Sequence, residues 1–205
     1  MRYAGIILAG GRSSRMAGPD ETTGDKAVAM LAGEPLVARA ARRLRPQVAR
    51  MALSTNGTAA RTILPDIDTI ADADDSRPGP LAGILAGLRW ARALSAPPAA
   101  LVSVAVDTPF FPADLVERLA AAGGSGTIAV AASLGARHPT FALWPLGLAD
   151  DLAAYLADGG RRVVTFIERH PHIDVDFPVA GFDPFFNINT PSDLAEAESL
   201  IRSIA

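Results

Sequence analysis

The sequence predicts an α/β fold in which helices cover both faces of a mostly parallel β-sheet, forming a three-layer sandwich. Short apolar runs, each long enough for one buried strand, alternate along the chain with segments whose apolar residues recur at helical spacing. The chain has 205 residues, of which 49% are hydrophobic, so it can bury an adequate core. No internal repeat or long linker divides it, and we therefore expect a single domain over residues 1–205.

The first half of the chain supplies four expected strands and three expected helices. Residues 3–9 form an apolar run without a charged residue, which indicates a central strand buried on both faces. A helix is expected at 112–121, because Pro112 stands near its first turn and two glycines follow it. The other expected strands are 48–54, 69–71 and 101–106, and the other expected helices, from their apolar spacing, are 36–44 and 81–94.

The second half of the chain has a more mixed pattern. Thr190 is placed to cap the N-terminus of a final helix, and Asp193 lies in its first turn, where a carboxylate is favourable. The expected helices are 146–156, 161–168 and 191–204. The expected strands are 127–132 and 140–144, with a further strand-like piece at 185–188.

Charge and composition exclude several functional classes. The net charge is −3 and the isoelectric point is near 5.6, which argues against bulk nucleic-acid binding. The chain has no cysteine, so disulfides, a thiolate nucleophile and cysteine-ligated metal sites are excluded. The run Gly-Gly-Ser-Gly at 123–126 splits the uncharged stretch between Arg118 and Arg137, so we expect no membrane span and a cytoplasmic protein.

The most specific local feature is the end of the first expected strand. Its apolar run is followed by Gly10 and Gly11, then by Arg15 and, further on, by Lys26. Glycine has no Cβ, so this backbone can press close to a phosphate oxygen, and the two cations can neutralise phosphate charge. The pattern predicts a nucleoside triphosphate site, although it is neither a Walker A motif nor a dinucleotide fingerprint. The alternative is a tight strand-to-loop turn without a ligand.

Polar residues follow several of the expected strands, and ligands of open α/β sheets bind at the carboxyl ends of the strands. Asp107 directly follows a buried strand and is the best candidate ligand for Mg²⁺, which prefers few carboxylates together with phosphate oxygens and water. Asp72 is placed to bind ribose hydroxyls. The alternatives are that Asp107 caps the turn into Pro109 and that Asp72 lies in a solvated acidic loop. The other polar residues at these ends are Asn56, Asn187 and Asn189.

Two further segments are candidates for substrate contact. The loop 78–83 leads into a helix start, whose free N–H groups suit a phosphate or a base edge; the alternative is a proline-set helix entry. His138, in the run 137–140, is a candidate contact for an anionic second substrate. Three histidines without clustered carboxylates do not indicate a zinc site, and no Gly-x-Ser-x-Gly elbow indicates a serine hydrolase.

Taken together, these motifs resemble the MobA-like NTP transferase family. The matching pieces run in order through nearly the whole chain: Leu-Ala-Gly-Gly-Arg-x-x-Arg-Met at 8–16, Asp-Lys at 25–26, Asn56, Asp72, Gly-Pro-Leu-Ala-Gly at 79–83, Asp-Thr-Pro at 107–109, and Asn-x-Asn-Thr-Pro at 187–191. The runs 137–140 and 160–163 also resemble this family. The resemblance implies a single Rossmann-like domain of the nucleotide-diphospho-sugar transferase type.

The resemblance also implies a reaction, the transfer of GMP from GTP to the terminal phosphate of molybdopterin with release of pyrophosphate. It implies Mg²⁺ as cofactor, held by Asp107, and exchange of the pterin with a molybdenum-insertion protein and molybdoenzyme chaperones. The implied catalytic residues are Arg15, Lys26 and Asp107. The implied nucleotide-binding residues are Leu8, Ala9, Gly10, Gly11, Lys26, Asn56, Asp72 and Asp107, and the implied pterin-side residues are Asn187 and Asn189.

Three alternatives stay open on the sequence. The nearest is a cytidylyltransferase acting on the same pterin, whose members tend to have Ala-Ala-Gly where this chain has Ala9-Gly10-Gly11. A sugar-phosphate nucleotidyltransferase is disfavoured because its Gly-Thr-Arg-Leu pattern is absent. The third is a non-catalytic nucleotide-binding module of the same fold. One departure from the family is the segment 17–24, which makes the link between Arg15 and Lys26 several residues longer than usual.

Overall fold

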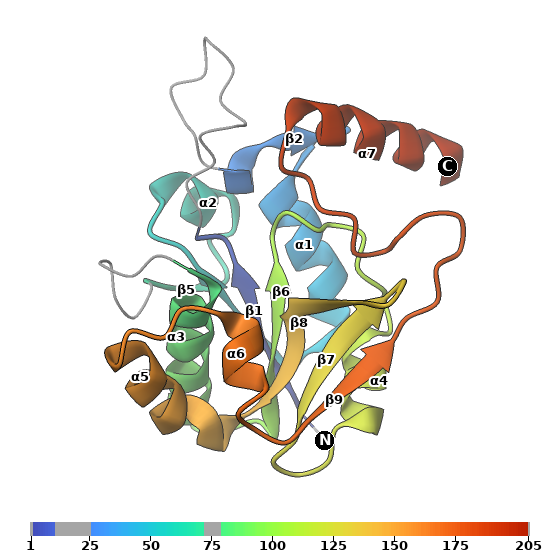
Figure 1. Ribbon diagram of the computed structural model, residues 1–205. Helices are drawn as coiled ribbons and strands as arrows, with labels where there is room; N and C mark the ends of the chain where they lie inside the picture. The colour runs from blue at the N-terminus through green and yellow to red at the C-terminus, as the bar shows by residue number, and fades with distance from the viewer. Residues whose placement is uncertain (1, 11–25, 72–78, 205) are drawn as a thin grey trace.

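A seven-stranded β-sheet runs through the centre of the computed structural model, which describes residues 2–10, 26–71 and 79–204 (Figure 1). The strand order is β5-β4-β1-β6-β8-β7-β9. β1 (Ala4–Leu8) lies between β4 (Arg50–Ser54) and β6 (Ala100–Ala105), pairs in parallel with both, and has all its residues buried. The uncharged run 3–9 therefore forms the central strand that its composition predicts.

Six of the seven strands in this sheet point the same way. β5 (Asp68–Ile70) is parallel to β4, and β9 (His172–Asp176) is parallel to β7 (Ile128–Ser133). β8 (Ala136–Pro145) runs antiparallel to both β6 and β7, so β7 returns to the common direction. The prediction of a mostly parallel sheet is confirmed, and the carboxyl ends of six strands meet at one edge.

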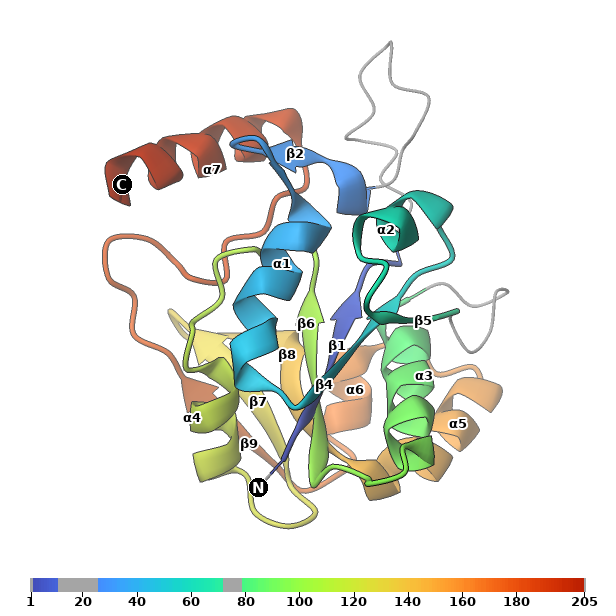
Figure 2. The ribbon, with the colours of Figure 1, turned by 180° about the vertical axis from the view of Figure 1, so that it is seen from behind.

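Helices cover both faces of the sheet, which confirms the predicted three-layer sandwich. α1 (Leu36–Leu44) and α4 (Leu115–Ala122) pack on the face that is turned to the viewer in Figure 2. α3 (Pro80–Ala93), α5 (Ala149–Ala157) and α6 (Val163–Ile167) pack on the opposite face. Each layer of helices shares its own buried apolar cluster with the sheet, and this burial is the main favourable term in the fold.

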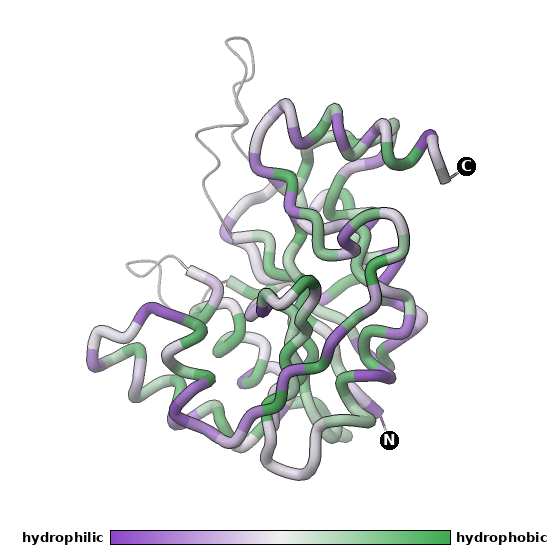
Figure 3. Tube along the Cα trace, turned by 45° about the vertical axis from the view of Figure 1, so that its right-hand side comes forward, coloured by the Kyte–Doolittle hydropathy of each residue, from purple (hydrophilic) through white to green (hydrophobic). Residues whose placement is uncertain are grey.

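Several small elements gather at the carboxyl edge of the sheet. They are the 3-10 turn η1 (Lys26–Val28), the hairpin of β2 (Met30–Leu31) and β3 (Glu34–Pro35), and helix α2 (Thr58–Ile63). The C-terminal helix α7 (Pro191–Ile204) lies over the same edge and packs against β2. Hydrophobic and hydrophilic residues alternate along α7 in Figure 3, as is typical of a helix with one buried face.

Most predicted elements are confirmed to within about three residues of their ends, which is the usual uncertainty of boundaries. The strand-like piece at 185–188 is wrong, because the N–H of Ile188 donates to the carbonyl of Asp107 and the segment joins no strand. The helix expected at 146–156 begins as the 3-10 turn η3 (Leu146–Leu148) before α5, and the one expected at 161–168 is shortened to α6.

An edge strand, a short helix and a two-stranded hairpin were not predicted. The edge strand β9 reads His-Ile-Asp-Val-Asp and exposes much of its length, so it lacks the apolar run by which the other strands were found. Helix α2 has only six residues, and the β2–β3 hairpin has two residues in each strand. Elements this short carry too few residues to display a period.

Candidate functional site

The end of β1 delivers backbone groups to the carboxyl edge in a fixed position. Leu8 and Ala9 are buried, at 8% and 7% exposure, whereas Gly10 is exposed. The carbonyl of Leu8 accepts a hydrogen bond from the N–H of Val106 (3.1 Å), and the N–H of Ala9 donates to the carbonyl of Ser54 (2.9 Å). The chain is thus held from both sides up to the point where Gly10 leaves the sheet.

Three of the predicted site residues lie outside the described part of the chain. These are Gly11, Arg15 and Asp72, so the roles assigned to them stay predictions. Asn56 lies within it and is exposed just beyond the end of β4, where Thr55 N–H donates to the carbonyl of Ile70 (3.1 Å). Asn56 is therefore at the same edge of the sheet as Gly10.

Lys26, Asp107 and Asn189 meet at the carboxyl edge although they come from three distant segments. The Lys26 ammonium lies 2.7 Å from Asp107 Oδ2 and 2.6 Å from Asn189 Oδ1. The side chains of Lys26 and Asp107 are 11% and 22% exposed, so the ion pair is mostly withdrawn from water but still open at the surface. Two predicted nucleotide-site residues and one predicted pterin-side residue are thus in direct contact.

The segment that carries Asn187 and Asn189 is anchored to the strand edge at one end. The N–H of Ile188, which is fully buried, donates to the carbonyl of Asp107 (2.8 Å). Asn187 and Asn189 stand on either side of Ile188 and are both exposed. This bond brings the segment with Asn187 and Asn189 to Asp107, and Asn189 reaches the Asp107 carboxylate through Lys26.

A capping box at the start of α7 anchors the other end of this segment. The Asp193 carboxylate accepts the N–H groups of Asn189 and Thr190 (2.8 Å each), and Thr190 Oγ1 accepts the N–H of Asp193 (3.2 Å). The N–H of Asn189, more than any other cause, holds the pKa of Asp193 below its usual value, and nearby Lys26 acts in the same direction. The predicted N-cap Thr190 is confirmed, and the helix start fixes Asn189.

The chemistry available at this edge is phosphate binding and charge stabilisation. In the described part of the chain, the Lys26 ammonium, the Asp107 carboxylate and the Asn189 amide meet here. Among the described residues, no group of three or more His, Asp or Glu is arranged to hold a metal ion.

Of the segment 78–83, residues 80–83 form the first turn of α3, and Gly83 contributes close packing there. A Cβ on Gly83 would lie 2.7 Å from Ser54 Oγ and 2.8 Å from Leu8 Cδ2, both in strands that end at the site. Glycine here lets the start of α3 press directly on β1 and β4. The signal in the sequence was a glycine inside an otherwise apolar helical pattern.

His138 does not join the Lys26 cluster. It lies half-buried near the start of β8, with Nε2 2.7 Å from Ser133 Oγ, and Ser133 in turn contacts Asp183 (2.8 Å). Ser133 and Asp183 were not predicted, because neither stands in a motif and their contact spans 50 residues. These contacts do not test the expectation that His138 touches an anionic substrate, which stays a prediction.

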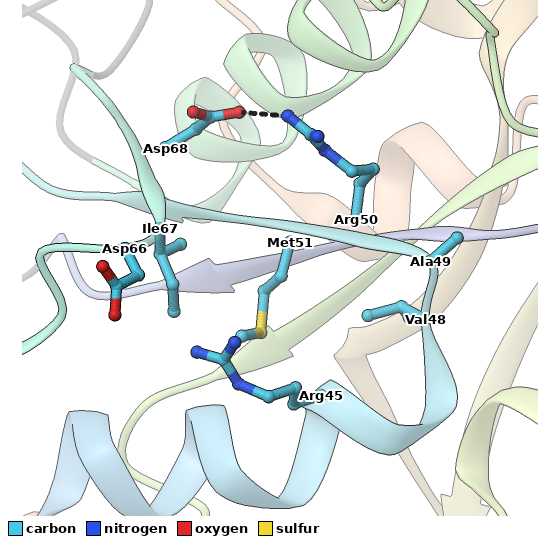
Figure 4. A pocket seen from close by; sticks show the side chains of 8 residues that line it. All are labelled: Arg45, Val48, Ala49, Arg50, Met51, Asp66, Ile67 and Asp68. Carbon is cyan, nitrogen blue, oxygen red and sulfur yellow. Dashed lines mark ion pairs between the residues drawn. The ribbon is translucent and has the colours of Figure 1, made fainter.

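A separate pocket lies at the opposite, amino edge of the sheet (Figure 4). Its polar lining pairs opposite charges, with Arg50 3.5 Å from Asp68. None of the predicted site residues lines it. The lining residues are Arg45, Val48, Ala49, Arg50, Met51, Asp66, Ile67 and Asp68.

The chain is similar over its full length to proteins that carry a functional name. A protein from Mesorhizobium japonicum named molybdenum cofactor guanylyltransferase is 49% identical over 98% of this chain and 97% of its own length. One of the same name from Cereibacter sphaeroides is 48% identical over the whole of both chains. In both cases the similarity is not confined to the motifs but runs along the whole chain.

A solved structure shows the same fold. It is the molybdopterin-guanine dinucleotide biosynthesis protein A from Archaeoglobus fulgidus, which is 24% identical and covers 98% of this chain and 99% of its own, with a TM-score of 0.76. The predicted fold class, of nucleotide-diphospho-sugar transferase type, is thereby confirmed. Residues 5–173 match the family described as the MobA-like NTP transferase domain. The chain therefore belongs to the family of MobA-like NTP transferase domains.

Proposed function

We propose that this chain transfers GMP from GTP to the terminal phosphate of molybdopterin, giving molybdopterin guanine dinucleotide and pyrophosphate. The observation that carries the proposal is the contact of Lys26 with both Asp107 and Asn189 at the carboxyl edge of the sheet. It brings a residue proposed for the nucleotide into contact with one proposed for the pterin. The full-length similarity to proteins named molybdenum cofactor guanylyltransferase supports the same reaction.

The reaction needs positioning more than proton transfer. An oxygen of the pterin phosphate attacks the α-phosphorus of GTP, a new O–P bond forms, and the bond from the α-phosphorus to the bridging oxygen breaks to release pyrophosphate. The attacking oxygen is already ionised at neutral pH, so no strong general base is required. What the protein supplies is alignment of the two phosphates and stabilisation of the negative charge.

Different residues bind the nucleotide, stabilise the negative charge and bind the pterin, according to their positions at the edge. The backbone at Leu8, Ala9 and Gly10 binds the guanine and phosphate side, where its peptide groups are already fixed by the neighbouring strands. Lys26 moves its ammonium from Asp107 and Asn189 to the triphosphate and holds the developing charge. Once the Lys26 ammonium has left Asn189, the Asn189 amide is available to the pterin. Asn187, in the same segment, is the second proposed contact on the pterin side.

The site also fits Mg²⁺. Asp107 Oδ2 is held by Lys26, and among the described residues Oδ1 accepts only a long contact from Thr108 Oγ1 (3.4 Å), which leaves acceptor capacity on the carboxylate. A single carboxylate is sufficient, because Mg²⁺ takes its remaining ligands from phosphate oxygens and water. Asp107 would hold the ion, which when bound neutralises charge on the phosphates. An Asp107→Asn variant should bind GTP more weakly in the presence of Mg²⁺ and lose most of the gain that Mg²⁺ gives to wild type.

The test of the function is a nucleotide panel followed by a transfer assay. Thermal unfolding is measured with GTP, CTP, ATP and UTP, each with and without Mg²⁺, and a ligand at 100 times its Kd should stabilise the fold by about 2.7 kcal/mol. Stabilisation by GTP alone, followed by pyrophosphate release on addition of molybdopterin, supports the proposal. Stabilisation by CTP instead would assign the cytidylyl reaction, and GTP binding without turnover would assign a binding module.

Other partners and the compartment are also proposals. The resemblance implies exchange of the pterin with a molybdenum-insertion protein and with molybdoenzyme chaperones. No helix in residues 2–10, 26–71 and 79–204 is both long and apolar enough to cross a membrane. The cytoplasmic location stays a prediction from the sequence.

A further inference from the structure

A hydrogen-bonded chain of three side chains lies beside the proposed site and takes no part in the reaction described above. Ser133 Oγ, at the end of β7, lies 2.7 Å from His138 Nε2 in β8 and 2.8 Å from Asp183 Oδ1 in the segment after β9. Ser133 is 1% exposed. Because β7 ends at the carboxyl edge of the sheet, these three residues lie at the same edge as Asp107.

The donors and acceptors of this chain can be assigned. The single hydroxyl proton of Ser133 is donated to the Asp183 carboxylate, which can only accept when ionised. His138 must then donate its Nε2–H to Ser133 Oγ. Burial lowers the pKa of His138, with Asp183 opposing the shift, so the neutral ring with its proton on Nε2 is the favoured form at neutral pH.

This order of residues differs from that of a serine hydrolase. In a catalytic triad the histidine stands between the serine and the aspartate, whereas here the serine stands between the other two. Ser133 therefore donates its hydrogen bond to Asp183, and no imidazole accepts its hydroxyl proton. Its burial also denies access to a substrate, so the three side chains hold structure in place.

The part held in place is the beginning of the segment that carries Asn187 and Asn189. Asp183 Oδ1 also accepts the backbone N–H of Phe185 (2.9 Å), and the Phe185 ring stacks on the His138 ring at 4.3 Å with an interplanar angle of 16°. Phe185 is 4% exposed. One carboxylate oxygen and one imidazole ring together fix both the backbone and the side chain at position 185.

We propose that Ser133, His138 and Asp183 are positioning residues that set Asn187 and Asn189 for the second, phosphate-bearing substrate. This inference rests on the proposed function. From Phe185 the chain needs only three residues to reach Ile188, whose N–H is bonded to Asp107, and one more to Asn189, which contacts Lys26. A fixed start at 183–185 therefore limits where the two amides can stand, and displacement by about 1 Å at a reacting centre can cost up to about 100-fold in rate.

The test compares two buried serines that are matched except for their location. Ser133→Ala breaks the chain of three. Ser103→Ala is the control, because Ser103 is also buried (0% exposed) and also makes two hydrogen bonds. Its hydroxyl accepts from Trp144 Nε1 (2.8 Å) and donates to the carbonyl of Thr140 (2.7 Å), so both bonds join β6 to β8. Both variants are measured for thermal stability, for amide hydrogen exchange in the segment 183–189, and for the KM of molybdopterin and of GTP.

The expected result is a difference between the two variants at similar losses of stability. Ser133→Ala should speed exchange in 183–189 and raise the KM of molybdopterin by about tenfold while changing that of GTP by about twofold or less, and Ser103→Ala should do neither. Asp183→Asn keeps an acceptor for Ser133 and Phe185 and should stay near wild type, unlike Asp183→Ala. Equal exchange in the two serine variants, or an unchanged molybdopterin KM in Ser133→Ala, would overturn the proposal.

The exchange measurement separates this inference from the proposed function. It needs no substrate, so it is read on any folded sample of the chain. If wild type makes no dinucleotide, the proposed function fails while unequal exchange still supports the anchoring of 183–189. If wild type is active and exchange is equal, the anchoring fails and the function stands.

Discussion

The two edges of the sheet each hold a cation paired with a carboxylate, but the two pairs are built differently. At the carboxyl edge Lys26 lies 2.7 Å from Asp107, and their side chains are 11% and 22% exposed. At the amino edge Arg50 lies 3.5 Å from Asp68, with side chains 63% and 50% exposed (Figure 4). The first pair joins segments that are 81 residues apart and also contacts Asn189, whereas the second joins two adjacent strands.

The difference in burial distinguishes an ion pair that can bind a ligand from an ion pair that is exposed to solvent. Charges mostly withdrawn from water interact more strongly than charges surrounded by it, so Lys26 can hold a phosphate that replaces Asp107 and Asn189. Lys26 is also the one lysine in the sequence, since every other residue among the 19 Lys and Arg is an arginine. An ammonium with three donors on a flexible stem suits a group that changes partners.

The largest expected effect follows from removal of the Lys26 ammonium. Lys26→Ala should lower kcat/KM for GMP transfer by about 100-fold to 1,000-fold, the range for loss of one group that stabilises transition-state charge. The fold should be kept, because the lost contacts lie at the rim of the sheet. Steady-state kinetics with GTP and molybdopterin measure the effect, and circular dichroism checks the fold.

A charge-conserving variant refines this comparison. Lys26→Arg keeps the positive charge but replaces a point charge with a planar fork, so GTP affinity should survive better than kcat. The lone lysine also allows a direct probe, because an amine-selective acylating reagent has one side-chain target in the chain and GTP should protect it. Full activity in Lys26→Ala would remove Lys26 from the mechanism.

The next expected effect is on the pterin side of the same contact. Asn189→Leu removes the amide while leaving the backbone N–H that Asp193 accepts, so the start of α7 should stay intact. We expect the KM of molybdopterin to rise by about tenfold, the cost of about 1.4 kcal/mol in binding, with a smaller change for GTP. An equal effect on both substrates would show that Asn189 acts through Lys26 alone.

Most of the fold could be predicted from the sequence because strands and helices here have a strong local signal. The run 3–9 contains no charge, so its only stable place is the centre of the sheet, and 191–204 has a cap at Thr190 and an acidic first turn. β9 could not be found in this way, because it is an edge strand with charged residues at alternate positions. The wrong strand at 185–188 has an apolar composition, but its backbone bonds go to a loop and not to a strand.

The candidate site could be predicted in part for a related reason. Lys26, Asp107 and Asn189 each stand where a strand or helix begins or ends, and the topology brings such ends to one edge. The contact between Ser133 and Asp183 could not be predicted, because it depends on β9 and on the path of the chain after it. Gly83 was singled out for its loop, whereas its role is a close approach between layers.

A smaller effect is expected from pH at the buried histidine. Burial holds the pKa of His138 below its ordinary 6.5, so below pH 6.5 the unfolded chain binds more protons at this residue than the folded chain. The contribution of His138 to stability is therefore fully present above pH 6.5 and is lost as pH falls through the window below it.

His138→Phe isolates this contribution, because it keeps an aromatic ring against Phe185 and removes the titration. Urea midpoints are measured for wild type and variant between pH about 7.5 and about 5.5, and the difference between the two proteins cancels contributions that they share. Wild type should lose more stability than the variant as pH falls. Parallel curves would contradict a buried, neutral His138.

The smallest effect on stability and activity is expected from a substitution at the amino edge. Arg50→Gln removes one charge of an exposed pair at 3.5 Å while leaving the 3.0 Å hydrogen bond from Trp90 Nε1 to Asp68. Exposed ion pairs contribute about 0–1 kcal/mol, so the free energy of unfolding should change by less than about 1 kcal/mol and GMP transfer should not change at all. Denaturant unfolding and the kinetic assay used for Lys26→Ala measure both quantities. A loss of activity in Arg50→Gln would mean that the pocket in Figure 4 communicates with the carboxyl edge, and the division of the sheet into a reactive edge and an inert edge would fail.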